Sequence, residues 1–344
     1  MKLATLKDGS RDGQLVVVSR DLSLAHHASG VATRLQQVLD DWNFLSPQLE
    51  DLYATLNGGK ARHAFPFEPH QCMAPLPRAC QWAHASGYLN HVALLRRAHG
   101  VERPEDTHLG LLIHQGGSDA LLGPTDDAFF FDEDAGIDFG AGLAVITGDI
   151  PMGAGPDQAL DGVRLLVLVN DWTLCHLEPV ELATGLRFLH SKPATAFGPL
   201  AVTPDELGEN WRGGRVHLPV CSSRNGRQVG ATDAGKGMDI PFGVILAHLA
   251  RTRPVRAGSI VGGGTVSHAD AASGYSCIAE QRAREMAAGG HASTGYLRFG
   301  DRLRIEVKGD DGQSLFGAIE QRVVGPGGAG APPAGPGVDA DTLG

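Results

Sequence analysis

Hydrophobic and polar positions along the chain follow two periods, one typical of strands and one typical of helices. Short apolar runs bounded by turn residues predict strands at residues 15–19, 142–151, 165–171 and 257–265, and a pair of strands between residues 300 and 324. Apolar residues at spacings of three and four predict helices at residues 32–42, 89–98, 157–163 and 240–253, and in the second half of 273–286. Because strands and glycine-rich turns outnumber helices, we predict a β-rich α+β fold rather than a doubly wound sheet.

Two local signals sharpen this pattern. The pair Asn225-Gly226 supplies the positive φ angles of a tight turn, so residues 214–230 are predicted to form a β-hairpin. Pro254 is predicted to stop the helix that precedes it.

Composition divides the chain into three parts. With 344 residues, 42% of them hydrophobic, the chain is long enough to bury a sizeable core. A Pro-rich stretch near residue 75 is typical of a linker. We therefore expect a small N-terminal domain at residues 1–75, a catalytic-type domain at 76–325 and a tail at 326–344. The tail is rich in Gly, Pro and Ala and has little apolar bulk, which is typical of a disordered segment.

The charge of the chain argues against two classes of partner. The formal net charge is −10, and no block of Lys or Arg offers a surface for nucleic acid or anionic lipid. The N-terminus lacks the apolar core of a signal peptide, and no stretch is long enough to span a bilayer. We expect a cytoplasmic protein that acts on a small molecule.

The five cysteines predict neither a disulfide framework nor a zinc site. They are scattered and show no CxxC spacing. We expect buried free thiols at Cys72, Cys80, Cys175, Cys221 and Cys277.

Lys192 is the first candidate for chemistry. It lies in the segment RFLHSKPATAFGPLAVTPDEL (residues 187–207), which follows the apolar strand ending at Asp171. Loops at strand ends often carry active-site residues, because the strand gives them a rigid base. On residue type alone, an ordinary surface lysine is the simpler reading. The surrounding residues favour a functional one.

Several segments in the order of the chain resemble the fumarylacetoacetate hydrolase family, in its bacterial branch. They include PLPRACQWAHASGYLNHV, HQGGSDALLGP, GIDFGAGLAVITGDIPMG, SKPATAFGPLAVTPDELG, RAGSIVGGGTVSHAD and SCIAEQR, and together they span roughly residues 70–325. The resemblance implies a mixed β-roll catalytic domain, a small N-terminal domain and a homodimer. It also implies hydrolysis, decarboxylation, hydration or isomerisation of β-diketo and α-keto acids.

The metal ligands that the resemblance implies are mostly replaced. Members of the family hold magnesium or calcium through four carboxylates, and hard cations need several oxygen ligands. In this chain the corresponding positions are His84, Gly140, Gly142 and Asp171, so three of the four carboxylates are absent. Since alternate strand residues share a face, we expect the two glycines to leave a void that admits a bulkier substrate. We expect neither magnesium nor calcium to bind.

The catalytic residues that the resemblance implies are present. His91 stands where the family places its general base, Glu280 where it places the acid that orients this base, and Lys192 where it places a lysine that stabilises developing negative charge. Thr265 matches a substrate-contacting hydroxyl, and Tyr88 lies in the same loop and first helical turn as His91. Without the resemblance, His91 would be read as structural and Glu280 as a favourable charge at a helix start.

Histidines also suggest a second kind of metal site. His190 and His268 stand where Gln and Asn are commoner in the family, and with His84 and Asp171 they form a hypothetical site for zinc, copper or iron, which imidazole suits.

We therefore expect an enzyme that acts on a keto acid or β-diketone-type molecule by C–C hydrolysis, decarboxylation or isomerisation without the family's metal. A catalytically silent homologue that binds a ligand or a partner is the alternative. A hydrolase whose metal is held by Asp171 and water is a third reading.

Overall fold

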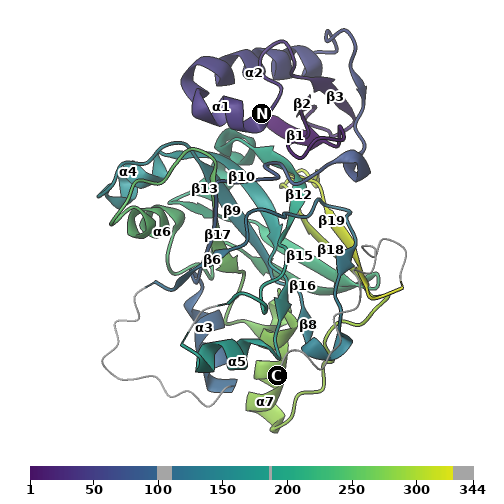
Figure 1. The fold of residues 1–344 in the computed structure, drawn as a ribbon, viewed down its shortest axis with the longest axis vertical. Helices are drawn as coiled ribbons and strands as arrows, with labels where there is room; N and C mark the ends of the chain where they lie inside the picture. Colours follow the sequence, from purple (N-terminus) through teal and green to yellow (C-terminus); the bar gives the residue numbers. More distant parts are fainter. Residues whose placement is uncertain (99–110, 186–187, 328–344) are drawn as a thin grey trace, which may run out of the picture.

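The computed structural model describes residues 1–98, 111–185 and 188–327, and its main feature is one long mixed sheet (Figure 1). In spatial order its strands are β4 (Phe65–Pro66), β3 (Leu24–His27), β2 (Gln14–Val18), β1 (Lys2–Leu6), β12 (Ala196–Val202), β10 (Val163–Asn170), β9 (Ala141–Thr147), β17 (Ser259–Thr265), β5 (Gln81–Ala85) and β6 (Ile113–Gly116). β10 and β9 are buried along nearly their whole length, as their continuous apolar sequences predict.

A second, five-stranded sheet contains the predicted hairpin. Its strands are β16 (Arg227–Asp233), β15 (Pro219–Arg224), β18 (Arg302–Val307), β19 (Ile319–Val324) and β7 (Ala128–Phe129). At the hairpin tip Asn225 and Gly226 have φ angles of 52° and 78°, which confirms the predicted turn. Two short strand pairs join β8 (Ile137–Asp138) to β11 (Thr173–Leu174) and β13 (Trp211–Arg212) to β14 (Arg215–Val216).

Helices lie around these sheets. They are α1 (Leu35–Asp40), α2 (Trp42–Asn57), α3 (Leu89–Ala98), α4 (Pro156–Leu160), α5 (Glu178–Ala183), α6 (Phe242–Leu249) and α7 (Ile278–Gly289), with 3-10 turns at η1 (Pro69–Gln71), η2 (Glu133–Ala135), η3 (Pro204–Asn210) and η4 (Ala271–Ser273). Of these, α1 and α2 pack against one face of the long sheet (Figure 1). The predicted β-rich α+β fold is confirmed. The prediction that the helix before Pro254 continues to that proline is wrong, since α6 ends at Leu249. Proline disfavours helical geometry in the residue before it, and the intervening residues 251–253 are exposed.

The N-terminal segment joins the main sheet directly. β1 pairs antiparallel with β12, with Lys2 opposite Val202. The apolar residues under α1 and α2 continue into the core of the rest of the chain and include Leu35, Val167 and Ile260. Figure 1 shows α1 and α2 at one end of the molecule, and α3, α5 and α7 at the other.

The five cysteines are free, as predicted. The prediction that all five are buried is wrong for two of them, since Cys80 is exposed and Cys221 is half-buried. The predicted tail lies outside the described residues from residue 328 onward, as does Arg187. No helix within the described part of the chain is long and apolar enough to cross a membrane.

Candidate active site

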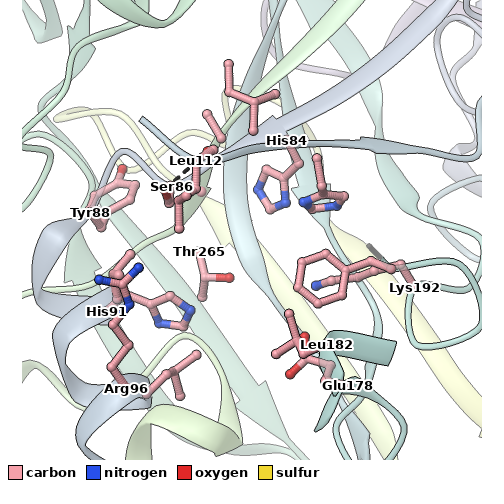
Figure 2. Close-up of a pocket in the computed structure, with 17 residues that line it drawn as sticks. His84, Ser86, Tyr88, His91, Arg96, Leu112, Glu178, Leu182, Lys192 and Thr265 are labelled. Carbon is pink, nitrogen blue, oxygen red and sulfur yellow. Dashed lines mark hydrogen bonds between the residues drawn. The ribbon is translucent and has the colours of Figure 1, made fainter. Parts of the chain in front are cut away.

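A cavity of about 360 Å³ lies where β5, α3, β6 and α5 meet (Figure 2). Five of the residues predicted from the sequence line it: His84, Tyr88, His91, Lys192 and Thr265. Residues separated by up to 181 positions in the sequence thus line one cavity. Asp171 and Glu280 lie behind its wall, each bonded to a residue that lines it.

His91 and Glu280 form a hydrogen-bonded pair. His91 Nδ1 lies 3.1 Å from Glu280 Oε2, and the glutamate side chain is only 1% exposed. The other carboxylate oxygen of Glu280 pairs with Arg284 one turn further along α7. Because Glu280 is held from both sides, it fixes the orientation of the imidazole. If Nδ1 donates to the carboxylate, Nε2 remains the proton acceptor.

The position of Glu280 depends on how α7 begins. Asp138 accepts hydrogen bonds of 2.7 Å from the backbone N–H groups of Ile278 and Ala279, and the Cys277 thiol accepts one from the N–H of Glu280. These bonds satisfy backbone donors that a helix start leaves without partners. Burial raises the pKa of Asp138 to about 6, although the N–H bonds oppose this shift. Asp138 is therefore a support for the site, which sequence reasoning missed.

Lys192, Asp171 and His84 form a second buried cluster. Asp171 Oδ2 accepts hydrogen bonds from Lys192 Nζ at 3.0 Å and from His84 Nδ1 at 2.8 Å, and Oδ1 accepts one from Thr195 at 3.2 Å. Burial alone would raise the pKa of Asp171, but Lys192 and His84 hold it well below its ordinary value. Burial alone would lower the pKa of Lys192, but Asp171 and Glu178 raise it. Lys192 is therefore an ammonium at neutral pH.

The hydroxyl of Tyr88 is engaged in a hydrogen bond within the protein. It donates a 2.8 Å hydrogen bond to the carbonyl oxygen of Ala234, and burial raises its pKa. Its ring lines the cavity, so Tyr88 forms part of the wall and is a poor candidate for proton transfer.

His114 is a site residue that the sequence prediction missed. It stands directly opposite His84 in the antiparallel pair β5–β6, and the two ring centroids are 5.5 Å apart. The ligand atoms of His84, His114 and Asp171 lie within 4.8 Å of one another. The motif HQGGSD contained this histidine, but only strand register shows which residue faces it. Arg96, Glu178 and Phe188 were missed as well, and they also line the cavity.

The predicted site for a transition metal at His84, His190, His268 and Asp171 is wrong for His190 and His268, whereas His84 and Asp171 do lie together. The side chain of His190 is 82% exposed and lies 3.9 Å from Glu181. His268 Nδ1 accepts a 3.1 Å hydrogen bond from the backbone N–H of Asp270. Neither lines the cavity, because local hydrogen bonds of their own loops hold both segments elsewhere.

The predicted void at Gly140 and Gly142 is also wrong. A Cβ atom on Gly140 would lie 2.7 Å from the carbonyl oxygen of Asp171, and one on Gly142 would lie 2.6 Å from that of Gly264. Neighbouring backbone therefore occupies the space that the missing side chains of Gly140 and Gly142 were expected to leave empty. Neither glycine lines the cavity, so they contribute no room for a bulkier substrate.

Because of this close approach, Gly142→Ala is expected to lower the free energy of unfolding by about 1–3 kcal/mol, the usual cost of overpacking a core. Denaturant unfolding followed by circular dichroism measures the change. Gly295→Ala is the control, since a Cβ there meets nothing within 4 Å. If both variants unfold like the wild type, the strands around Gly142 separate more easily than the packing indicates.

The residues present do not fit a hard divalent cation. Asp171 is the single carboxylate at the four positions that correspond to the family's ligands, and both of its oxygens already accept hydrogen bonds. Such cations need several oxygen ligands. His84, His114 and Asp171 would suit a softer metal better, but the ammonium of Lys192 lies 3.0 Å from the same carboxylate oxygen and opposes a second cation there.

Comparison with known proteins agrees with this fold over nearly the whole chain. The family model for the fumarylacetoacetase N-terminal domain 2 matches residues 1–78, and the model for the fumarylacetoacetate (FAA) hydrolase C-terminal domain matches residues 80–324. None of the curated proteins compared with the chain matches it.

Solved structures show the same fold at low sequence identity. Fumarylacetoacetate hydrolase from psychrophilic Exiguobacterium antarcticum is 18% identical with a TM-score of 0.61, covering 94% of this chain and 99% of that one. Maleylpyruvate hydrolase from Sphingobium sp. SYK-6, in complex with manganese(II) and pyruvate, is 17% identical with a TM-score of 0.61 and the same coverage. The 5-carboxymethyl-2-hydroxymuconate delta-isomerase from Mycobacterium smegmatis is 14% identical with a TM-score of 0.59, covering 95% and 100%. The protein belongs to the fumarylacetoacetate hydrolase family.

Proposed function

We propose that the protein is an enzyme that hydrolyses or isomerises a keto acid or β-diketone-type small molecule, with His91 as its general base. The observation that supports this most is that His91, which is bonded to Glu280, and the Lys192 ammonium line the same cavity. A base held by a carboxylate and a cation for developing charge are the groups such reactions need. The relatives of the same fold include hydrolases and an isomerase of this kind of substrate.

Proton transfer would pass through His91. In hydrolysis, Nε2 takes a proton from water as the oxygen adds to the carbonyl carbon. The C–C bond then breaks, its electron pair forms an enolate on the leaving fragment, and the proton on Nε2 returns to the enolate carbon. In isomerisation, the same nitrogen takes a proton from one carbon and returns it to another. Glu280 stabilises the imidazolium that forms in either case.

Lys192 would stabilise the enolate or oxyanion oxygen. Its ammonium is shared between Asp171 and the hydroxyl of Thr173, which lies 2.7 Å away, so it is positioned before substrate arrives. A positioned charge costs little reorganisation during the reaction. The hydroxyl of Thr265, which Figure 2 shows between His91 and Lys192, is a further contact for the substrate.

This proposal does without the magnesium or calcium that the family resemblance implies and without the manganese of the maleylpyruvate hydrolase complex. It is supported by the donor set, in which one carboxylate surrounded by hydrogen-bond donors replaces several free carboxylates. The positive charge at Asp171 comes from Lys192 and does not depend on a bound ion.

Turnover of a panel of acylpyruvates and β-keto acids, measured with and without chelator, tests the proposal. Elemental mass spectrometry of the same sample gives its metal content. We expect turnover that chelator and added Mn²⁺ leave unchanged, with no stoichiometric metal. A stoichiometric metal whose removal abolishes turnover would overturn the metal-free mechanism. No turnover of any substrate would favour a catalytically silent, ligand-binding homologue.

A further inference from the structure

Some of the charged side chains at the cavity have an ion-pair partner nearby, and others have none in the part of the chain that the structure describes. Lys192 is paired with Asp171, and Glu280 behind the wall is shared by His91 and Arg284. Arg96 also lines the cavity, yet across residues 1–98, 111–185 and 188–327 no carboxylate lies within ion-pair distance of its guanidinium. A guanidinium that has no such carboxylate partner among the described residues, in a partly enclosed and largely apolar cavity, attracts an anion.

Arg96 and Lys192 lie on opposite sides of this cavity. Figure 2 shows Arg96 beside α3 on one side of the view and Lys192 on the other, with His91 and Thr265 between them. Arg96 is on α3, five residues after His91, so one helix carries both groups. The cavity surface beside Arg96 includes the apolar side chains of Val92 and Leu95. Arg96 and His91 therefore line the same side of the cavity, on one helix.

Glu178 places a negative charge at one side of the cavity, so the two sides differ in electrostatic potential. Its carboxylate lines the side near Lys192, and in the described part of the chain no cation lies within ion-pair distance of it. It acts electrostatically on Lys192, whose pKa it helps to raise. A substrate carboxylate is thus repelled near Glu178 and attracted at Arg96. An uncharged carbonyl is tolerated beside Lys192.

We infer that Arg96 binds the carboxylate of the substrate, on the side of the cavity opposite Lys192, and thereby determines specificity for anionic keto acids. The inference rests on the proposed function, because it assumes that the reacting carbonyl lies by His91 and Lys192. With a guanidinium as anchor, the carboxylate needs no metal to hold it. Two parallel N–H bonds from the planar guanidinium would also fix its orientation.

Kinetics with a charged and an uncharged substrate test the inference. Acetopyruvate and its methyl ester differ in the charge of the carboxyl group and share the reacting β-diketone. Arg96→Met is expected to raise KM for acetopyruvate by about 10- to 100-fold, the range for losing a charge-assisted hydrogen bond, and to change kcat only slightly. KM for the ester should stay the same, and Arg96→Lys should restore part of the affinity for the acid.

Arg97→Met is the matched control. Arg97 is the next residue of α3, is exposed and does not line the cavity. It should leave both values of KM unchanged. Equal effects of Arg96→Met on acid and ester, or equal effects of the two variants, would overturn the assignment.

Binding separates this inference from the proposed catalytic role. Calorimetry measures Kd of acetopyruvate for His91→Ala alone and combined with Arg96→Met, where turnover is not needed. A 10- to 100-fold weaker Kd in the double variant supports Arg96 as the anchor, even if the wild type shows no turnover. An unchanged Kd, or no binding to His91→Ala at all, would overturn it.

Discussion

His91→Ala is expected to reduce kcat for keto-acid turnover by about 10²- to 10⁴-fold, the usual contribution of a positioned general base. His91 is 19% exposed at the cavity wall and bonded to Glu280, so its loss removes both the proton acceptor and the group that Glu280 orients. KM should change little, because the proposed carboxylate contact is at Arg96. Steady-state kinetics with the best acylpyruvate of the panel gives both numbers.

Two variants control for structural effects. His190→Ala removes an exposed histidine two residues from Lys192 and should leave kcat unchanged. Glu280→Gln keeps the shape but not the charge, so kcat should fall by less than in His91→Ala and the pH profile of kcat/KM should shift. If His91→Ala keeps wild-type kcat while remaining folded, His91 is not the base.

Asp171→Asn is expected to lower the free energy of unfolding by about 3–5 kcal/mol, the cost of removing one partner of a buried ion pair. The side chains of Asp171 and Lys192 are only 2% and 14% exposed, so water cannot replace the lost charge. Lys192 would lose the carboxylate with which it is paired in the folded protein. Urea unfolding followed by circular dichroism measures the difference.

This effect should depend on pH with a definite sign. The pKa of Asp171 lies well below its ordinary value in the folded protein, held there by Lys192 and His84 against the effect of burial. The stabilisation is therefore fully present above about pH 4 and is lost as the pH falls through the folded pKa. The wild type and Asp171→Asn should converge in stability at strongly acid pH.

The exposed ion pair of Asp12 and Arg78 provides a comparison. Its side chains are 43% and 50% exposed at a distance of 2.6 Å, so Asp12→Asn should cost no more than about 1 kcal/mol. Equal costs for the two variants would show that the Asp171–Lys192 pair is not isolated from water.

Turns and strands that are determined by residues close together along the chain could be predicted from the sequence. The turn at Asn225-Gly226 requires only positive φ angles that these residue types adopt readily. The strand at residues 163–170 is predicted by its nearly continuous apolar sequence, since a strand that is buried on both faces has few polar side chains. The fold class follows from such signals.

Part of the site also followed from the sequence. The segments around His91, Lys192 and Glu280 carry enough residues in a fixed order to mark them, and the structure brings them to one cavity. Their roles are proposals that the variants above test.

Tertiary structure decided the rest, because contacts across strands depend on register and backbone distance. Register alone places His114 opposite His84, 30 residues away. Backbone packing closes the space at Gly142, where residue type alone suggested a void. The sequence by itself determined the fold class and marked His91, Lys192 and Glu280 as candidates for chemistry. Only the folded chain decided that Lys192 pairs with Asp171 and that Arg96 has no ion-pair partner among the described residues, because ion pairs depend on distances in space and not on spacing along the chain.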